Sequence, residues 1–217
     1  MAARATRRVT APDIAARKSE GVNTPPLVMV TAYDAPSART ADAAGVDVIL
    51  VGDSVAMVVL GYDDTLQVTT EDMAHHVGAV ARTRPRALVV ADLPWLSYHV
   101  STEETVHNAA RLVRAGAGAV KLEGGRKRVD AVRAIIDAEI PVMGHIGLTP
   151  QSIHTLGGFK VQGKGLDAAK ALADDAVSLA EAGVFALVLE CVPDAVARII
   201  TEAVGVPTIG IGAGRHC

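Results

Sequence analysis

Short runs rich in valine, isoleucine and leucine alternate along this chain with longer segments that have the spacing of amphipathic helices. Each short run is apolar throughout, which is typical of parallel strands buried on both faces. Seven runs are predicted as strands: 27–33, 47–51, 87–91, 119–122, 141–145, 185–190 and 207–211. The alternation therefore predicts an α/β fold built around a parallel sheet.

Two of the segments between these runs show the helical period directly. Apolar residues recur at helical spacing on the faces formed by Val106, Ala109, Ala110 and Val113 and by Leu172, Ala176, Leu179 and Ala180. Ser101 followed by Glu104 has the pattern of a capping box that opens the first of these helices. Left-handed glycine caps are predicted where helices turn back towards the sheet, at Gly45, Gly116, Gly183 and Gly205.

This order of elements fits either a doubly wound open sheet or a (β/α)₈ TIM barrel. No Gly-x-Gly-x-x-Gly motif follows the first run, and acidic residues stand at the C-terminal ends of several runs, where a barrel gathers its active site. The barrel is therefore favoured. Because a barrel with seven strands leaves two edges unpaired, we expect the eighth strand and last helix to be missing from these 217 residues.

The composition narrows the class of protein. Half of the residues are hydrophobic, and 21 basic side chains stand against 24 acidic ones, which predicts one globular domain over 1–217 with 1–10 as a flexible tail. The net charge of -3 and the lack of a Lys/Arg block argue against nucleic acid or an anionic membrane as partner. No secretory signal or membrane span is recognisable, and two cysteines suit a reducing compartment. We expect a cytoplasmic enzyme acting on small molecules.

Charged residues stand at the ends of six predicted strands: Asp34, Asp53, Asp92, Lys121 with Glu123, His145 and Glu190. In a barrel these residues fall on one rim, where several carboxylates would repel one another unless a cation lay among them. Oxygen ligands favour Mg²⁺ or a similar hard ion, with zinc as an alternative. Such a site would chelate an α-keto acid and stabilise the enolate formed from it.

Some of these carboxylates have a structural interpretation as well. Asp34 precedes Ala-Pro-Ser and is expected to cap a helix rather than to bind a ligand. Capping alone does not explain why Asp53 and Asp92 recur on neighbouring strands, so ligand binding is favoured for both. Glu190 follows an apolar strand, where burial of a charge is costly without a task, and is a candidate general base.

Lys121, Glu123 and His145 allow two interpretations each. The period of a strand points Lys121 and Glu123 the same way, towards the barrel axis, either as functional groups or as a structural ion pair. His145 is either a pocket residue or a core histidine bonded to a backbone carbonyl. The long loop over 144–164, with its glycines, is a candidate lid, a contact for a second substrate or an oligomer contact.

Five segments in this order resemble the ketopantoate hydroxymethyltransferase family: Val51–Ser54, Ala91–Pro94, Val120–Gly125, Gly144–Gln151 and Gly210–Gly214. Each segment is short, but five in the right order at strand ends are specific, and the resemblance runs from about Leu27 to Cys217. It implies a (β/α)₈ barrel that continues past the last segment with a final strand and that assembles as a homo-oligomer, in many members a decamer.

The resemblance also implies a reaction and roles for the rim residues. The family transfers a hydroxymethyl group from 5,10-methylenetetrahydrofolate, the co-substrate, to 3-methyl-2-oxobutanoate, with Mg²⁺ as the metal. Matched by motif, the metal ligands would be Asp53, Asp92 and Glu123, the keto acid would contact Asp53, Ser54, Asp92, Lys121 and His145, and the proton acceptor would be Glu190.

Three other functions compete with this one. A metal-dependent 2-oxo acid lyase of the phosphoenolpyruvate and isocitrate lyase kind would use similar enolate chemistry. A phosphosugar isomerase is suggested by the glycine-rich turn Gly210–Gly214, near where barrels often hold phosphate, but it leaves the carboxylates unexplained. The third is a non-catalytic barrel stabilised by a metal.

Overall fold

The computed structural model describes residues 7–19 and 25–217. The strands are β1 Met29–Thr31, β2 Val48–Val51, β3 Leu88–Asp92, β4 Ala119–Glu123, β5 Val142–Gly147, β6 Ala186–Glu190 and β7 Thr208–Ile211. The α-helices are α1 Ala11–Ala16, α2 Ala35–Ala43, α3 Val55–Val58, α4 Thr70–Ala81, α5 Thr102–Ala115, α6 Val129–Asp137, α7 Ile153–Leu156, α8 Leu166–Glu181 and α9 Asp194–Ala203. Short 3₁₀ helices are η1 Arg17–Ser19, η2 Arg126–Arg128 and η3 Pro150–Ser152.

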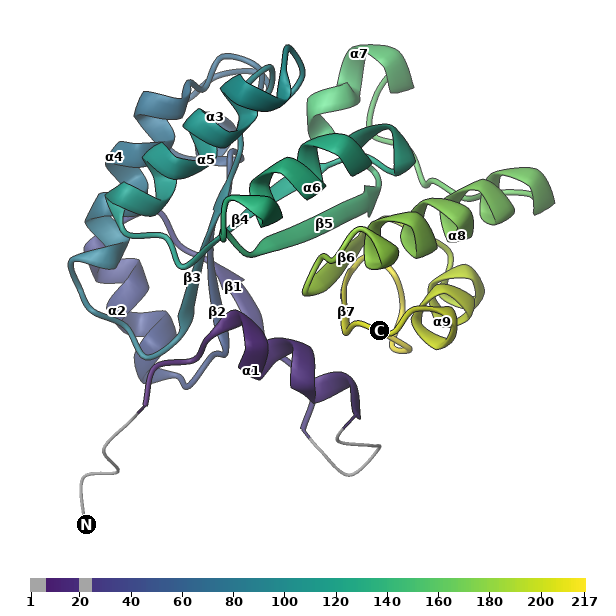
Figure 1. The fold of residues 1–217 in the computed structure, drawn as a ribbon, viewed down its shortest axis with the longest axis horizontal. Helices are drawn as coiled ribbons and strands as arrows, with labels where there is room; N and C mark the ends of the chain where they lie inside the picture. Colours follow the sequence, from purple (N-terminus) through teal and green to yellow (C-terminus); the bar gives the residue numbers. More distant parts are fainter. Residues whose placement is uncertain (1–6, 20–24) are drawn as a thin grey trace.

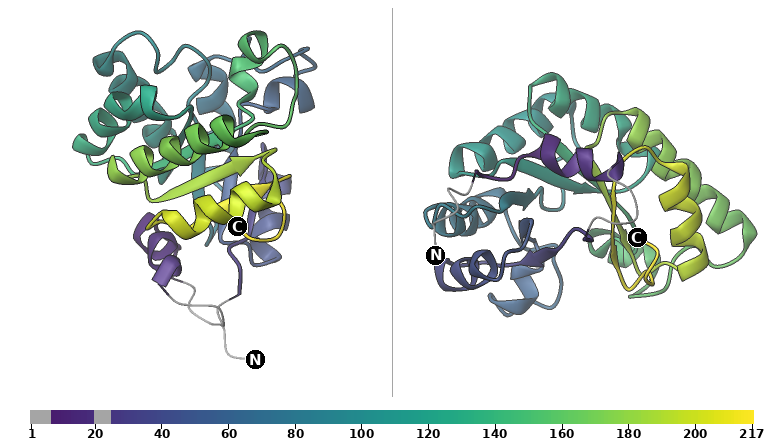
Figure 2. Two further views of the ribbon diagram at one scale, coloured as in Figure 1. Left: turned by 90° about the vertical axis from the view of Figure 1, so that its right-hand side faces the viewer. Right: turned by 90° about the horizontal axis from the view of Figure 1, so that it is seen from below.

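The seven strands form one parallel sheet in the order of the sequence, from β1 to β7. Each strand pairs with the next, and the sheet curls into a nearly closed barrel with helices outside it (Figure 1). The right panel of Figure 2 shows the helices as an arc that runs through the sequence colours from blue to yellow. The predicted barrel and its seven strands are confirmed, with β1 and β7 as the two edges of the sheet.

Two apolar clusters hold the barrel together. The larger lies between the strands and the outer helices and includes Val120 and Leu122. The smaller one lies inside the barrel, where the alternate residues Ala119 and Met143 point, and α1 adds Ile14 to it. Side chains that face the helices therefore alternate along each strand with side chains that face the barrel interior.

The local predictions hold in part. Helix α8 buries Ala176 and Leu179 as expected, and Gly45, Gly116 and Gly183 have positive φ. Helix α5 buries Thr105, Asn108, Ala109 and Leu112, so the predicted face is confirmed only in part, at Ala109. The buried Asn108 amide donates to the Ser97 carbonyl. Val204, not Gly205, caps α9 in an extended conformation, and Ser101 caps α5 without the return bond from Glu104.

The N-terminal segment expected to be a flexible tail is described from residue 7 onwards. The Val9 N–H donates to the Arg86 carbonyl, and Thr10 caps α1 by accepting from the Asp13 N–H. Residues 1–6 lie outside the described part of the chain. Among the described residues, no helix is long and apolar enough to cross a membrane.

Candidate active site

Inward-facing side chains change from apolar to charged towards the C-terminal ends of the strands. On β4, Lys121 and Glu123 follow Ala119 at alternate positions, as the period of a strand requires. Pairing between strands then sets Asp92 beside Lys121 and Glu123 beside His145. The strand register therefore brings these charged groups together at one rim, as the sequence predicted.

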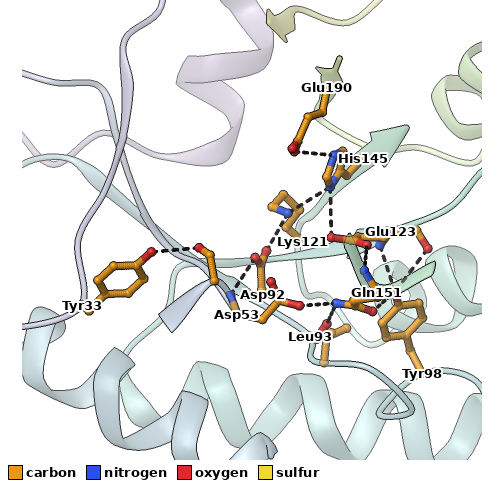
Figure 3. Close-up of polar contacts among 11 residues, drawn as sticks. Tyr33, Asp53, Asp92, Leu93, Tyr98, Lys121, Glu123, His145, Gln151 and Glu190 are labelled. Carbon is orange, nitrogen blue, oxygen red and sulfur yellow. Dashed lines mark hydrogen bonds and ion pairs between the residues drawn. The ribbon is translucent and has the colours of Figure 1, made fainter. Parts of the chain in front are cut away.

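A chain of polar contacts joins these residues (Figure 3). Lys121 Nζ lies 2.9 Å from Asp92 Oδ1 and 3.3 Å from His145 Nδ1. His145 Nδ1 also lies 3.4 Å from Glu123 Oε1, and its Nε2 lies 3.2 Å from Glu190 Oε2. Lys121, Glu123 and His145 are almost fully buried, whereas the Glu190 side chain is 24% exposed. The chain of contacts thus runs from the buried interior to a carboxylate that solvent and substrate can reach.

His145 stands at the centre of this chain and can serve it in two protonation states. In the neutral ring, Nδ1 accepts from the Lys121 ammonium, and the protonated Nε2 lies 3.2 Å from Glu190 Oε2 without a well-aligned hydrogen bond. In the charged ring, Nδ1–H donates to Glu123 instead. Burial and Lys121 both lower the pKa of His145, but the hydrogen bonds to Glu123 and Glu190 outweigh them and raise it.

Asp53 and Ser54 follow β2 directly and extend the site towards β1. The Asp53 N–H donates to Asp92 Oδ2 over 3.1 Å, so the two aspartates lie side by side. The Ser54 hydroxyl is 2.8 Å from the Tyr33 hydroxyl. Asp34, which ends the first predicted strand, is not part of this group, because its carboxylate caps α2 by accepting from the Ser37 N–H, as predicted.

The buried carboxylates outnumber the cations that face them. Burial raises the pKa of Asp53 well above its usual value, and the charges of Asp92 and Glu123 raise it further. Burial lowers the pKa of Lys121, but Asp92, Glu123 and Asp53 outweigh that effect and raise it. Three buried carboxyl groups therefore face one ammonium group, and they cannot all be ionised at low cost unless a further cation lies among them.

Comparison with known proteins gives the family. The model of the ketopantoate hydroxymethyltransferase family matches residues 8–217. This chain belongs to that family. A 3-methyl-2-oxobutanoate hydroxymethyltransferase of Syntrophomonas wolfei is 60% identical over 192 residues, which cover 88% of this chain and 70% of the relative. One of Moorella thermoacetica is 59% identical over 211 residues, covering 97% and 77%.

Solved structures with low sequence identity share the barrel fold. A 2,3-dimethylmalate lyase, a member of the PEP mutase/isocitrate lyase superfamily, superposes with a TM-score of 0.68 at 22% identity, over 95% of this chain and 75% of the lyase. The phosphoenolpyruvate phosphomutase of Streptomyces platensis has a TM-score of 0.62 at 18% identity, over 84% and 64%. At these identities the similarity concerns the fold alone.

The donor set at the rim of this hydroxymethyltransferase fold suits a hard divalent cation. Asp53 and Asp92 are adjacent carboxylates, and Asp92 Oδ1 is buried without a well-aligned hydrogen bond, although Lys121 Nζ lies near it. Glu123 points to His145 and Gln151 instead. In the part of the chain that the structure describes, no three His, Cys, Asp or Glu side chains are already grouped as metal ligands. The predicted three-carboxylate set is therefore a close pair with a third carboxylate beside it.

Three residues of the site were not predicted from the sequence: Tyr33, Tyr98 and Gln151. Tyr98 and Gln151 are almost fully buried against Glu123, and Tyr33 reaches Ser54. All three come from segments that follow strands, where no periodic pattern indicates direction. Gln151 ends one of the family segments, and that position was the available signal for it.

Proposed function

We propose that this chain transfers a hydroxymethyl group from 5,10-methylenetetrahydrofolate to 3-methyl-2-oxobutanoate, giving 2-dehydropantoate for pantothenate synthesis. One observation carries the proposal: Lys121, His145 and Glu190 line the same cavity of about 200 Å³ at the open end of the barrel. That volume equals roughly seven water molecules at about 30 Å³ each, a size suited to a small keto acid. The names of the relatives and the family segments support the same reaction.

Lys121 would bind the anionic end of the keto acid in this proposal, because it lines the cavity and supplies a buried positive charge. The Ser54 hydroxyl, which follows β2 and lies 2.8 Å from the Tyr33 hydroxyl, would be a second contact. A Mg²⁺ or similar ion held by Asp53 and Asp92, with Glu123 reaching it through water, would polarise the keto oxygen and so acidify the neighbouring C–H. Three buried carboxyl groups that face one ammonium group support a cation beside Asp53 and Asp92.

Proton removal falls to Glu190 in this proposal. Its carboxylate is partly exposed and is oriented by His145 Nε2 at 3.2 Å, so that one carboxylate oxygen stays available to take a proton. Glu190 removes the C3 proton, and the electron pair of that C–H bond enters the keto group to form an enolate. The C3 carbon then bonds to the one-carbon unit of the folate as one of the two C–N bonds of that unit breaks. Water displaces the second nitrogen and supplies the hydroxyl oxygen, and tetrahydrofolate leaves with its two nitrogens protonated, one by the proton taken from C3 and one by a proton of the water.

The first test isolates the enolate step from the folate. Proton NMR of 3-methyl-2-oxobutanoate in D₂O follows the C3–H signal with the protein and Mg²⁺, and again with EDTA. We expect the signal to fade with Mg²⁺ and to persist with EDTA. In Glu190→Gln we expect the exchange rate to fall by about 10²–10⁴-fold, since the variant cannot accept the proton.

Other outcomes of this test favour other functions. Stabilisation against heat by Mg²⁺ without exchange of any keto acid would favour a non-catalytic barrel. Cleavage of a carbon–carbon bond in a 2-oxo acid without folate would favour a lyase. Exchange followed by no product on adding the folate would leave the enolate step in place and remove the proposed one-carbon donor.

A further inference from the structure

Gln151 lies at the meeting point of four segments of the active site. It belongs to η3, directly after β5, and is 6% exposed. Gly147 makes this position possible, because its φ of +98° turns the chain at the end of β5, and a Cβ there would lie 2.2 Å from the Glu190 carbonyl oxygen. The turn brings Gln151 back over the strand ends.

Every polar group of the Gln151 amide has a partner (Figure 3). Its Nε2 donates to Asp53 Oδ2 at 2.7 Å and to the Leu93 carbonyl at 3.0 Å. Its Oε1 accepts from the Tyr98 hydroxyl at 2.5 Å. The backbone N–H of Gln151 donates to Glu123 Oε2 at 3.1 Å. One residue therefore binds both a metal-candidate aspartate and the neighbouring glutamate.

The surrounding bonds fix which way the amide faces. The Tyr98 hydroxyl accepts from the Glu123 N–H at 3.2 Å. Its single proton has two acceptors, Gln151 Oε1 at 2.5 Å and the Glu123 carbonyl at 3.3 Å, and the shorter distance favours Gln151. The amide nitrogen must then face Asp53 and Leu93, which are both acceptors. A carboxylate in this place would set negative oxygens against two acceptors, so the site requires the amide.

These bonds leave the two carboxylates little freedom to rotate. With Oδ2 of Asp53 held by the amide, its Oδ1 has no hydrogen-bond partner among residues 7–19 and 25–217 and remains available. With Oε2 of Glu123 held by the backbone of Gln151, its Oε1 is left to face His145. Each carboxylate thus has one oxygen held by Gln151, and the direction of its other oxygen is defined by that bond.

We propose that Gln151 is a positioning residue, which holds Asp53 and Glu123 in the orientation that binds the divalent cation and the keto acid. This inference rests on the proposed function. Gln151 also begins the long loop after β5, whose other end is tied by the Gln162 N–H to the Cys191 carbonyl, next to Glu190. The loop is therefore anchored beside both groups of proposed functional residues.

The test compares three variants with a matched control. Gln151→Ala removes the amide, Gln151→Glu replaces it by an isosteric acid, and Tyr98→Phe frees the amide to rotate while leaving its donors in place. Gln67→Glu makes the same charge change at an exposed glutamine. Mn²⁺ binding, followed by electron paramagnetic resonance, gives a readout that does not need turnover, and C3–H exchange gives kcat and KM.

We expect Gln151→Ala and Gln151→Glu to weaken Mn²⁺ binding and to lower kcat for exchange by about 10–100-fold each, as is usual for partners that orient metal ligands. Tyr98→Phe should cause a smaller loss of both, and Gln67→Glu should match the wild type. Unchanged Mn²⁺ affinity and kcat in folded Gln151→Ala would overturn the proposal. If Gln151→Glu does not fold, the results of Gln151→Ala and Tyr98→Phe test the proposal. Failure of the proposed function looks different, because the wild type itself would then neither exchange the keto acid nor bind Mn²⁺.

Discussion

The barrel interior contains two layers of side chains, one apolar and one charged, and the strands of the sheet contribute to both. The lower layer, towards the N-terminal ends of the strands, is apolar and includes Val48, Leu88, Ala119, Met143 and Ala186, with Ile14 of α1 packed against them. The upper layer consists of Asp92, Lys121, Glu123, His145 and Glu190. Within β4, a step of two residues leads from Ala119 to Lys121.

The apolar layer contributes mainly to the stability of the fold, and the charged layer contains the groups proposed for the reaction. The lower layer stabilises the fold by removing apolar surface from water, and it needs no specific partner for each atom. The upper layer buries charges at a cost that only mutual pairing and a bound cation offset. A substitution in the upper layer should therefore lower the rate of C3–H exchange, with or without a loss of stability. A substitution in the lower layer should lower the free energy of unfolding and leave the exchange rate unchanged.

The largest expected effect comes from making the upper layer resemble the lower one at Lys121. Lys121→Met keeps the length of the side chain but removes the buried ammonium that faces Asp92 at 2.9 Å. We expect C3–H exchange to fall by roughly 10³-fold, or about 4 kcal/mol at 1.36 kcal/mol per factor of ten. The free energy of unfolding should fall by about 3–5 kcal/mol, because a buried charge loses its partner. Urea denaturation measures the second quantity.

A double variant distinguishes pairing from packing as the cause. Asp92→Asn with Lys121→Met removes the ammonium together with its nearest carboxylate, so part of the lost stability should return while exchange stays abolished. If the double variant is as unstable as Lys121→Met, the pair with Asp92 does not account for the loss, and the proposed role of that pair is wrong.

The next effect concerns the base of the lower layer. Ile14 is 1% exposed, and α1 places it against the apolar interior. Ile14→Ala should lower the free energy of unfolding by about 2–5 kcal/mol, through lost burial and the cavity left behind. Exchange per folded molecule should not change. If Ile14→Ala does not fold, Ile14→Val replaces it in the test, with an expected loss of about 0.5–1.5 kcal/mol in the free energy of unfolding. A loss of exchange in folded Ile14→Val would show that the layers are coupled.

The two layers also explain what the sequence could predict. All seven strands were located because parallel strands buried on both faces have uniformly apolar sequences. The upper layer was predicted for the same reason, since a charged residue at the end of such a run stands out. The face of α5 was predicted only in part, because Asn108, a residue type expected at the surface, is buried and donates to the Ser97 carbonyl.

The rest of the site depends on contacts between loops. Gln151 and Tyr98 are far apart in the sequence, and the strands that precede them, β5 and β3, are separated in the sheet by β4. They meet because the segments after these two strands come together beside Glu123, at the end of β4. No periodicity predicts which way a side chain points in such a segment. Glu123 shows the consequence. Its role as a metal ligand stays a prediction, and its contacts with His145 and with the backbone of Gln151 were not predicted, because they join three separate segments of the chain.

The smallest expected effect is a single hydroxyl placed in the lower layer. Val48 is fully buried on β2 within the apolar interior, and Val48→Thr changes its shape little. The buried threonine hydroxyl would lose its hydrogen bonds to water and gain none from the apolar side chains around it. We therefore expect the free energy of unfolding to fall by about 1–3 kcal/mol, with the rate of C3–H exchange unchanged. Val58→Thr, at a position that is 69% exposed, should stay within about 0.5 kcal/mol of the wild type. Equal stability of the two variants would mean that water reaches the lower layer, and the sharp boundary between the two layers would then have to be abandoned.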